Sequence, residues 1–450
     1  MGRLFGTDGI RGIANEQLTA VLAYRIGQAA ATVLRQNTGR KPHVVIGKDT
    51  RISSDMLEGA ITAGFTACGA DVHTLGVVST PAVALITVQT KADAGVVISA
   101  SHNPYEYNGI KFFGPDGSKL DDAMETAIED LILMDGEIPL VKAEDIGMTH
   151  NDRHMVDGYL RYIASTIKGE PHDLRVLVDC ANGAASVTAQ RLLNRFDIDV
   201  TYINDEPNGV NINAGCGSTC LSALGEKVKN GFYDLGIAFD GDADRCLAVD
   251  ENGEEIDGDK IMALCANAMK EVGDLKNNGF VATVMGNMGL HKYAQERGYK
   301  VLCANVGDRN VREMMVKEDM VLGGEQSGHI IFLNHMPTGD GQLTALHFLS
   351  IVSKYDEAVS SLVSQIKRYP QVLINVPGPH DNKAKADLIA SDVVQAAVKA
   401  EEEAFAGSGR ILVRPSGTEA LLRVMVEAPE EDLCRQVAER LANVIENAQK

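Results

Sequence analysis

Short apolar runs alternate with amphipathic helical stretches along most of this 450-residue chain. Apolar residues at helical spacing predict helices, and compact apolar runs predict buried strands between them. The expected helices cover residues 16–35, 53–68, 184–194 and 289–297, and the expected strands cover residues 44–46, 95–99, 176–178 and 280–285. Asn15 is the expected N-cap of the first helix. Strands that alternate with helices form parallel sheets with helices on their faces, so we expect an α/β fold.

The C-terminal part of the chain has a different pattern. Residues 383–405 predict one long helical segment, residues 409–413 and 421–426 a hairpin-like pair of strands, and residues 433–448 a closing helix. Polar segments divide the chain at residues 135–157, after Asp250 and at Tyr369-Pro370. We therefore expect three mixed α/β sheet domains with helices on the sheet faces and a smaller C-terminal α+β domain. Their predicted bounds are 1–150, 151–252, 253–368 and 369–450.

The chain is acidic, with 62 acidic and 42 basic residues and a formal net charge of −20. A nucleic-acid partner needs a basic surface, and the chain lacks Trp, the best stacking residue. No apolar run is long enough to cross a membrane, and residues 1–7 contain no apolar signal core. The eight cysteines are scattered without a zinc-binding spacing, which fits reduced thiols. We therefore expect a cytoplasmic protein with neither a membrane nor a nucleic acid as partner.

Asp240, Asp242 and Asp244 stand at alternating positions between two short apolar runs. The apolar runs predict two strands, so the aspartates are expected in the loop that joins them. Three neighbouring carboxylates repel one another unless a cation binds among them, and oxygen ligands favour Mg²⁺ over Zn²⁺. An EF-hand calcium loop does not fit, because Arg245 stands where that loop requires glycine. A solvated acidic turn is the remaining alternative.

Ser101 follows a predicted buried strand in the segment Ser99-Ala-Ser-His-Asn-Pro104. Pro104 ends the regular structure, so Ser101 is expected at the carboxyl end of a strand, where open α/β sheets build their sites. A serine there can be a nucleophile or a phosphoryl carrier, with His102 or Lys111 nearby in sequence. A Ser-His hydrolase fits poorly, because no Gly-x-Ser-x-Gly elbow surrounds Ser101. An ordinary loop serine is the alternative.

The segment Gly323–His329 is a candidate for binding sugar hydroxyls. Glu325 and Ser327 lie two residues apart and face the same way if the segment is extended. His329 adds a hydrogen-bond donor or a proton-transfer group. A polar turn with all its hydrogen bonds satisfied is the alternative.

The segment Arg414–Glu419 is a candidate for binding phosphate. It combines a guanidinium, two hydroxyls and the backbone amide of a glycine, which together suit an anion in a tight turn. A polar hairpin turn is the alternative. Arg11, in a glycine-rich loop ahead of the first helix, and the pair Asp308-Arg309 are weaker candidates, because a lone arginine in a loop is usually a surface residue.

Together and in this order, four segments resemble the motifs of the α-D-phosphohexomutase superfamily. They are the phosphoserine loop Ser99–Pro104, the metal loop Asp240–Arg245, the sugar loop Gly324–His329 and the phosphate loop Arg414–Glu419. The resemblance spans nearly the whole chain, and Gln326 resembles the branch of the superfamily that acts on glucosamine. It implies four domains around a central cleft, each of which contributes one motif.

The resemblance also implies an activity. It is the interconversion of glucosamine 6-phosphate and glucosamine 1-phosphate, which feeds UDP-N-acetylglucosamine and bacterial cell-wall synthesis. The implied mechanism uses a phosphorylated Ser101, Mg²⁺ and a sugar 1,6-bisphosphate as intermediate. The implied partner is a small hexosamine phosphate, and a homodimer is expected at the level of the family.

The resemblance gives the candidate residues roles. The implied ligands of Mg²⁺ are Ser101, Asp240, Asp242 and Asp244. The implied catalytic residues are Ser101, His102, Lys111, Arg245, His329 and Arg11. The implied substrate-binding residues are Glu325, Ser327, Arg414, Ser416, Gly417, Thr418, Asp308 and Arg309. The base that takes the proton of the attacking hydroxyl is expected to be Lys111 or His329.

Three alternative functions stay open from the sequence. An aspartyl-phosphate phosphatase would carry its phosphoryl group on Asp240 instead of Ser101. A sensor of sugar phosphates would use the same segments without catalysis. Phosphomannomutase or phosphoglucomutase activity would place the chain on another branch of the same superfamily.

Overall fold

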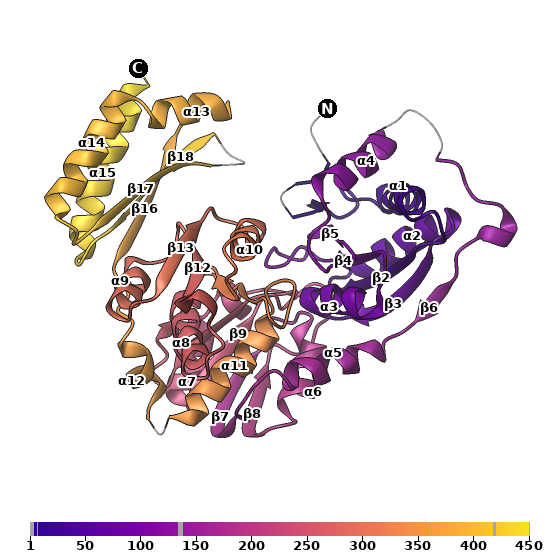
Figure 1. Ribbon diagram of the computed structural model, residues 1–450, viewed down its shortest axis with the longest axis horizontal. Coiled ribbons are helices and arrows are strands. Elements are labelled where there is room, and N and C mark those ends of the chain that lie inside the picture. Colours follow the sequence, from indigo (N-terminus) through magenta and orange to yellow (C-terminus); the bar gives the residue numbers. More distant parts are fainter. Residues whose placement is uncertain (1–3, 7, 134–137, 356, 417–419, 450) are drawn as a thin grey trace. The chain divides into compact units, whose positions relative to one another are not determined.

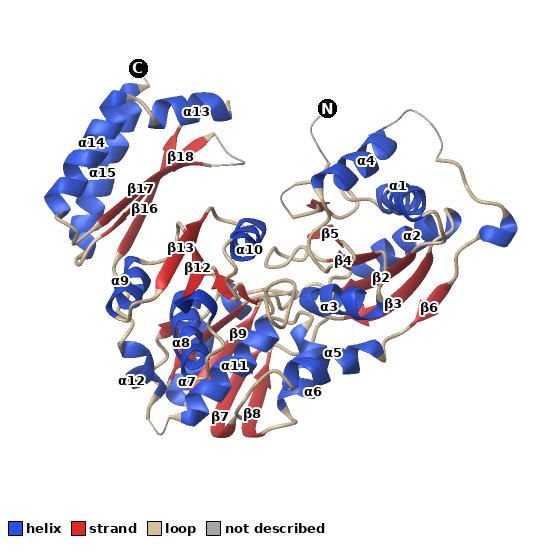
Figure 2. Cartoon of the chain, viewed as in Figure 1, coloured by secondary structure: helices blue, strands red, loops and turns tan. Residues whose placement is uncertain are grey.

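The computed structural model describes residues 4–6, 8–133, 138–355, 357–416 and 420–449. The chain divides into two compact units, Met1–Met285 with Tyr299–Ser364 and Gly286–Gly298 with Gln365–Lys450. Helices and strands alternate through the chain (Figure 1). Figure 2 shows that the strands stand together in groups, with helices beside them. Within the described part of the chain, no helix is both long and apolar enough to span a bilayer.

Six strands build the first sheet. The strands are β1 (Ile10–Ile13), β2 (His43–Lys48), β3 (Asp71–Val77), β4 (Ala94–Ile98), β5 (Tyr107–Phe113) and β6 (Thr149–Asn151), and the helices are α1 (Ala20–Thr38), α2 (Ser54–Ala67), α3 (Thr80–Thr90) and α4 (Asp122–Leu133). Their order is β1-β5-β4-β2-β3-β6, and only β5 runs against the others, since it is antiparallel to both of its neighbours, β1 and β4. Val44 and Ile46 join the core under α1 and α2, whereas a Cβ at Gly47 or Gly95 would strike Val83 of α3. Helices therefore cover both faces of this sheet.

Five strands build the second sheet, in the order β11-β10-β9-β7-β8. The strands are β7 (His172–Asp179), β8 (Asp197–Ile203), β9 (Leu235–Phe239), β10 (Cys246–Asp250) and β11 (Glu255–Ile256), and the helices are α5 (Met155–Ala164), α6 (Ala185–Leu193) and α7 (Ser222–Asn230). β9 is parallel to β7 but antiparallel to β10. The three aspartates thus lie in a hairpin loop between two strands, as the sequence predicts.

The third sheet has four strands in the order β13-β12-β14-β15. The strands are β12 (Gly279–Thr283), β13 (Lys300–Ala304), β14 (Leu322–Gly324) and β15 (Ile330–Phe332), and the helices are α8 (Gly258–Glu271), α10 (Asp308–Lys317), α11 (Gly341–Lys354) and α12 (Val359–Ser364). β14 and β15 are antiparallel, so the candidate sugar loop is the turn between them.

The C-terminal unit contains a three-stranded antiparallel sheet in the order β16-β18-β17. Its elements are β16 (Gln371–Pro377), α13 (Asn382–Ile389), α14 (Asp392–Phe405), β17 (Arg410–Pro415), β18 (Leu421–Glu427) and α15 (Glu431–Ala448). Helix α9 (Met288–Glu296) also belongs to this unit, although β12 and β13 flank it in the chain. The buried carboxylate of Glu427 accepts hydrogen bonds from Met288 N–H (3.0 Å) and Asn287 Nδ2 (3.1 Å), which fixes the start of α9.

The expected fold class is confirmed, because four α/β sheets carry helices on their faces. Two details of the prediction are wrong. The first helix is capped by Thr19, whose Oγ1 accepts from Leu22 N–H at 3.1 Å, and Asn15 lies in the preceding turn. The long segment 383–405 breaks at Ser391, whose hydroxyl donates to Leu388 O and competes with the helical backbone.

Candidate active site

Ser101 lies in the loop after β4, at the carboxyl edge of the parallel part of the first sheet. The residue is buried, and its backbone has a left-handed φ of 51°, a conformation that costs roughly 1–2 kcal/mol for a residue with a Cβ. Its Oγ donates a hydrogen bond of 2.6 Å to Asp240 Oδ2 and lies 3.3 Å from His102 Nδ1. The serine therefore faces the acidic loop of the second sheet.

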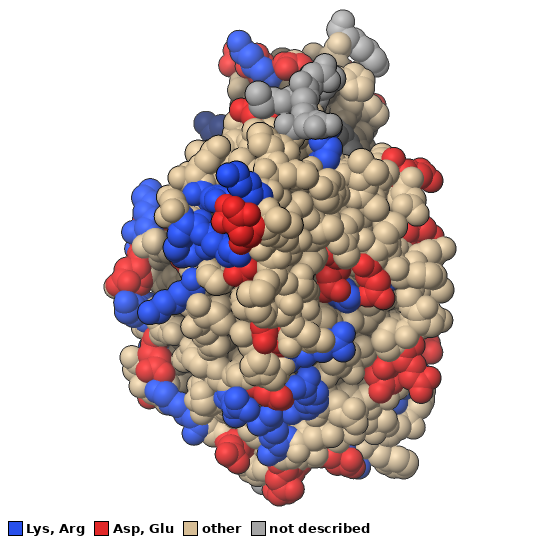
Figure 3. All heavy atoms as spheres, turned by 90° about the vertical axis from the view of Figure 1, so that its right-hand side faces the viewer, with Lys and Arg blue, Asp and Glu red and all other residues tan. Residues whose placement is uncertain are grey.

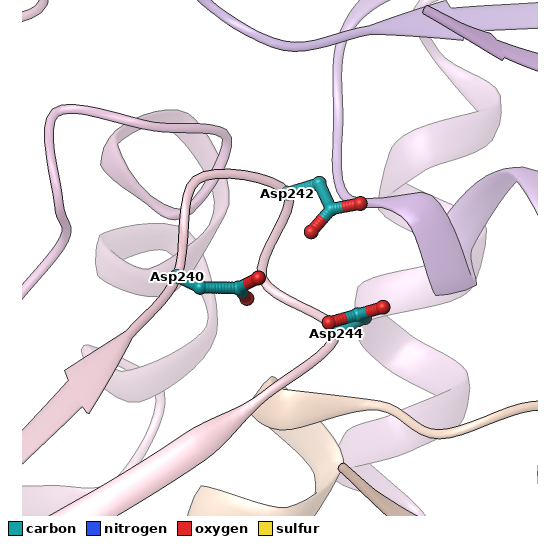
Figure 4. A group of neighbouring side chains, drawn as sticks. All are labelled: Asp240, Asp242 and Asp244. Carbon is teal, nitrogen blue, oxygen red and sulfur yellow. The ribbon is translucent and has the colours of Figure 1, made fainter. Parts of the chain in front are cut away.

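Asp240, Asp242 and Asp244 point toward one another from the loop between β9 and β10 (Figure 4). One carboxylate oxygen of each residue lies within 4.8 Å of the others. Burial, followed by the charges of Asp244 and Asp242, raises the pKa of Asp240 well above its ordinary value. In the described structure, Oδ1 of Asp242 and Oδ1 of Asp244 are buried without a hydrogen-bond partner. Converging oxygens of this kind fit a hard divalent cation such as Mg²⁺.

Lys111, on β5, supplies a cation to this cluster. Its Nζ lies 2.9 Å from Asp242 Oδ2 and 3.2 Å from Asp8 Oδ2. Burial alone lowers the pKa of Lys111, but Asp242 and Asp8 outweigh burial and raise that pKa above its ordinary value. Arg11, on β1, forms an ion pair with the same Asp8. Both residues are thus charged groups close to the acidic loop.

Two further candidates, Arg245 and His102, lie beside the aspartates and the serine. Arg245 donates its backbone N–H to Asp240 Oδ1 at 3.2 Å, and its Nε lies 3.9 Å from Asp244 Oδ1. Burial and the positive charges of Arg245 and Arg11 lower the pKa of His102 to about 4. The imidazole of His102 is therefore neutral near pH 7.

His329 lies on the other side of the acidic loop and is buried. Its Nδ1 is 3.4 Å from Asp244 Oδ2, and its Nε2 accepts a hydrogen bond from Gly339 N–H at 3.2 Å. Burial lowers the pKa of His329, but Asp244, Asp308 and Glu325 raise it to about 9. The N–H of Gly339 needs a lone pair on Nε2, so this hydrogen bond belongs to the neutral ring, whose proton lies on Nδ1, toward Asp244. The raised pKa means that the ring gains a second proton, on Nε2, below about pH 9.

The candidate sugar loop is a tight turn and not an extended segment. Glu325 Oε1 accepts from Gly307 N–H at 2.9 Å, and Gln326 Nε2 donates to Asp257 Oδ2 at 3.2 Å. Ser327 is exposed. Gly328 has a left-handed φ of 92°, and a Cβ there would lie 2.4 Å from Cys246 O. The turn is therefore packed directly against the end of the acidic hairpin.

Asp308 and Arg309 begin α10, close to the first sheet. Lys119 Nζ joins the carboxylates of Asp308 (2.8 Å) and Asp8 (2.9 Å). Arg309 pairs with Asp122 at 2.7 Å. Lys119, Asp308 and Arg309 line a cavity of about 200 Å³. Asp308 is thus linked to the acidic cluster, whereas Arg309 is engaged with an acid on α4.

The candidate phosphate loop joins β17 to β18 in the C-terminal unit. Arg414 lies directly opposite Arg423 across the two strands. Burial and the charge of Arg423 lower the pKa of Arg414, and Nε of Arg414 has no hydrogen-bond partner among the described residues. Ser416 is buried, and its backbone N–H donates to Leu421 O at 2.9 Å. Gly417 and Thr418 lie outside the described residues.

The sequence does not predict several residues that lie beside the three aspartates or beside Arg414. Thr80, at the start of α3, donates its hydroxyl to Asp242 Oδ2 at 2.8 Å. Asp8 and Lys119 extend the ion-pair network, and Arg423 doubles the charge beside Arg414. The glycine-rich segment around Asp8 and the strand pattern around Arg423 indicate these two residues only weakly. Nothing in the sequence pattern singles out Thr80 or Lys119.

Basic side chains gather at particular places although the chain as a whole is acidic. On the face drawn in Figure 3, Lys and Arg side chains lie among Asp and Glu side chains. Local basic groups such as Lys111 and Arg11 allow an anion to bind despite the net charge of −20.

Four family models of phosphoglucomutase/phosphomannomutase match the chain. Alpha/beta/alpha domain I matches residues 2–137, domain II residues 157–253, domain III residues 257–369 and the C-terminal domain residues 373–444. A phosphoglucosamine mutase from Acetivibrio thermocellus is 50% identical over 447 residues, and one from Ruminiclostridium cellulolyticum is 48% identical. Each alignment covers 99% of this chain and 99% of the relative.

Solved structures share the fold at low sequence identity. A phosphoglucomutase/phosphomannomutase family protein from Burkholderia thailandensis superposes with a TM-score of 0.83 at 22% identity, covering 99% of this chain and 97% of that one. The N-acetylphosphoglucosamine mutase of Aspergillus fumigatus, in complex with GlcNAc-6P and magnesium, superposes with a TM-score of 0.73 at 19% identity, covering 99% and 96%.

Proposed function

Because this chain belongs to the phosphoglucomutase/phosphomannomutase family, and within it to the phosphoglucosamine mutases, we propose that it interconverts glucosamine 6-phosphate and glucosamine 1-phosphate. The reaction moves a phosphoryl group between two hydroxyls of one sugar, so the protein is an isomerase. Its product is the precursor of UDP-N-acetylglucosamine and, through it, of peptidoglycan.

One observation supports this proposal most directly. Ser101 Oγ is hydrogen-bonded to Asp240 within a cluster of three converging carboxylates. A serine that carries a phosphoryl group needs concentrated positive charge beside it, and an oxygen-only site for a divalent cation supplies that charge. An aspartyl-phosphate phosphatase would instead need Asp240 as the free nucleophile.

The metal site would be formed by Asp240, Asp242 and Asp244 together with the oxygen of Ser101. When bound, Mg²⁺ offsets the negative charge of the phosphoryl group. Lys111 carries its charge 2.9 Å from Asp242, so its ammonium acts as a fixed cation and not as the base. Arg245 and Arg11 add two more positive groups near the serine. The magnesium in the fungal neighbour supports this choice of ion.

The attacking sugar hydroxyl must lose its proton during transfer. We assign the acceptor to His102, because its imidazole is neutral and lies 3.3 Å from Ser101 Oγ. His329 uses both ring nitrogens, one toward Asp244 and one toward Gly339. Its role is then to hold Asp244 in place.

We infer roles in substrate binding for residues of three segments of the chain. Glu325 and Ser327 bind sugar hydroxyls in either orientation of the bisphosphate, with Asp308 and Arg309 beside them. Arg414, Ser416, Gly417 and Thr418 bind the phosphate that is not being transferred. A sugar 1,6-bisphosphate forms when Ser101 gives up its phosphoryl group. This intermediate must reverse its orientation in the site before its other phosphate is transferred back to Ser101.

A coupled assay with the phosphates of glucosamine, glucose and mannose tests the proposal. The assay contains Mg²⁺ and a trace of the matching 1,6-bisphosphate. We expect kcat/KM to be highest for glucosamine 6-phosphate. Preference for mannose or glucose phosphates would move the chain to another branch, and no isomerisation of any of them would leave a sensor of sugar phosphates.

The proposal also includes the location of the protein, its oligomeric state and its domain bounds. We infer a cytoplasmic location, because the substrate and the reduced thiols belong to that compartment. A homodimer is proposed from the family, and sedimentation analysis of the purified protein would measure it. The domain bounds 1–150, 151–252, 253–368 and 369–450 are likewise proposed, and limited proteolysis followed by mass analysis would locate them.

A further inference from the structure

A buried guanidinium lies behind the backbone of the loop that carries Ser101. The side chain of Arg51, which follows β2, has no exposed surface. Its Nη2 donates hydrogen bonds to Ser101 O (2.9 Å) and Asn103 O (2.8 Å). Its Nη1 donates to Tyr107 O (3.0 Å) and to Pro104 O. One side chain therefore binds four carbonyls, three in the loop between β4 and β5 and one on the first residue of β5.

Asp49 holds this guanidinium in place. Its Oδ2 accepts from Arg51 Nε at 2.8 Å and from Ser99 Oγ at 2.6 Å. Its Oδ1 accepts from Ser54 Oγ at 2.9 Å and from the backbone N–H of Arg51 at 3.0 Å. Ser99 Oγ in turn accepts the backbone N–H of Ser101 at 3.0 Å. Asp49 thus orients the guanidinium and, through Ser99, the serine itself.

The backbone of Ser101 needs such restraint. Its left-handed φ of 51° is unfavourable for a residue with a Cβ, and the loop would relax without contacts that hold it. The carbonyl of Ser101 is also bound from the second sheet domain, by Asn213 Nδ2 at 2.9 Å. A Cβ at Gly241 would lie 2.6 Å from the same carbonyl, so the acidic loop approaches closely.

We propose that Arg51 is a positioning residue for phosphoryl transfer, which acts by fixing the carbonyls of the serine loop so that Ser101 Oγ stays aimed at Asp240. The hydrogen bonds of Arg51 to the serine loop go to its carbonyls and not to Ser101 Oγ, so its effect passes through the backbone. The inference rests on the proposed phosphoserine function of Ser101. During turnover Ser101 gains and loses a highly charged group, and a loop bound at four carbonyls keeps its geometry in both states.

Arg51→Lys tests the proposal, because lysine keeps the charge beside Asp49 but cannot donate to four carbonyls from one planar fork. We expect kcat to fall about 100-fold while KM for glucosamine 6-phosphate changes less than about threefold. We expect the transfer of a phosphoryl group from glucosamine 1,6-bisphosphate to Ser101 to slow by the same factor. Intact-protein mass in a single-turnover experiment measures this rate. Arg40→Lys is the matched control, since Arg40 forms a similar bidentate pair with Asp93 at 2.7 and 2.9 Å and is 54% exposed.

Arg51→Ala, with guanidinium ion added back, separates positioning from folding. Guanidinium can refill the site beside Asp49, so we expect it to restore part of the transfer rate. Restored thermal stability without a restored rate would show a structural role and overturn the proposal. A wild-type transfer rate in Arg51→Lys would also overturn it. Wild-type protein that never accepts phosphate on Ser101 would instead overturn the proposed function, and this inference with it.

Discussion

Ser101 Oγ and Asp240 Oδ2 lie 2.6 Å apart, although 139 positions separate them in the chain. The serine follows β4 of the first sheet, and the aspartate follows β9 of the second. The hydrogen bond therefore joins two sheets at the edge where their loops meet. Because the same carboxylate belongs to the acidic cluster, the environment of the serine depends on whether a cation balances that cluster.

Ser101→Ala removes the hydroxyl and should abolish phosphoryl transfer. We expect kcat to fall by on the order of 10⁴-fold or more, as for other nucleophiles that act as part of a unit. The free energy of unfolding should fall by only about 1.5–3 kcal/mol, since one hydrogen bond to a charged group is lost. A coupled assay, intact mass and thermal melting measure the three quantities. Undiminished mutase activity in this variant counts directly against the phosphoserine mechanism.

Mg²⁺ affinity should rise with pH. Burial and two neighbouring carboxylates raise the pKa of Asp240, so a cation competes with a proton for this cluster at higher pH than it would for a free carboxylate. Binding therefore releases protons, and affinity falls as pH drops below the raised pKa of Asp240. Calorimetry near pH 6 and near pH 8, in buffers of different ionisation enthalpy, measures both effects. Asp432→Asn, an exposed acid at the start of α15, is the control and should leave them unchanged.

A dissociation constant that does not vary with pH, without proton release, would show that Asp240 is already ionised before the cation binds. Chelation of the metal gives a second measure. Dialysis against a chelator should abolish isomerisation, and Mg²⁺ should restore it. Restoration by Zn²⁺ alone would contradict the oxygen-only ligand set.

Arg414→Ala should weaken substrate binding more than it slows chemistry. Two arginines face each other at Arg414 and Arg423, so an anion that binds there meets two positive charges. A lost charge-assisted hydrogen bond is worth about 1.5–3 kcal/mol, so we expect KM to rise roughly 10- to 100-fold. Steady-state kinetics with glucosamine 6-phosphate measure it. Arg435→Ala, in an exposed helical pair with Glu431, is the matched control, and an unchanged KM in Arg414→Ala would exclude the phosphate-binding role.

The sequence predicts the parts of this site that depend on local pattern. Ser101 and the three aspartates were located because short strands end immediately before them, and strand ends are readable from apolar runs. Arg51, Thr80 and Lys119 were not predicted. Arg51 reaches its partners because β2 pairs with β4 within the first sheet. Thr80 and Lys119 reach Asp242 and Asp308 because separate sheets pack against one another. The break at Ser391 was missed for a different reason, since the apolar spacing continues through it.

Stability should fall in mild acid because of His347, on α11. Its ring stacks on Phe332 with centroids 4.6 Å apart, and its Nε2 lies 3.1 Å from Thr166 Oγ1. Burial, and then the charge of His335, lower the pKa of His347 to about 3. The unfolded chain takes up this proton near pH 6.5, so below that pH the unfolded state binds more protons than the folded one. The free energy of unfolding therefore decreases as pH falls from about 6.5 toward 3.

The size of this effect is measurable by comparing two variants. The full linkage is about 1.4 kcal/mol per pH unit, and we expect roughly 1 kcal/mol between pH 6.5 and pH 5 because the ring is partly exposed. His347→Gln keeps a polar group near Thr166 and should lose less stability over that interval than wild type in thermal melts. His154→Gln changes a side chain that is 75% exposed and should follow wild type. Equal acid sensitivity in wild type and His347→Gln would mean that His347 takes up its proton equally well in the folded protein, and that other groups set the response to acid.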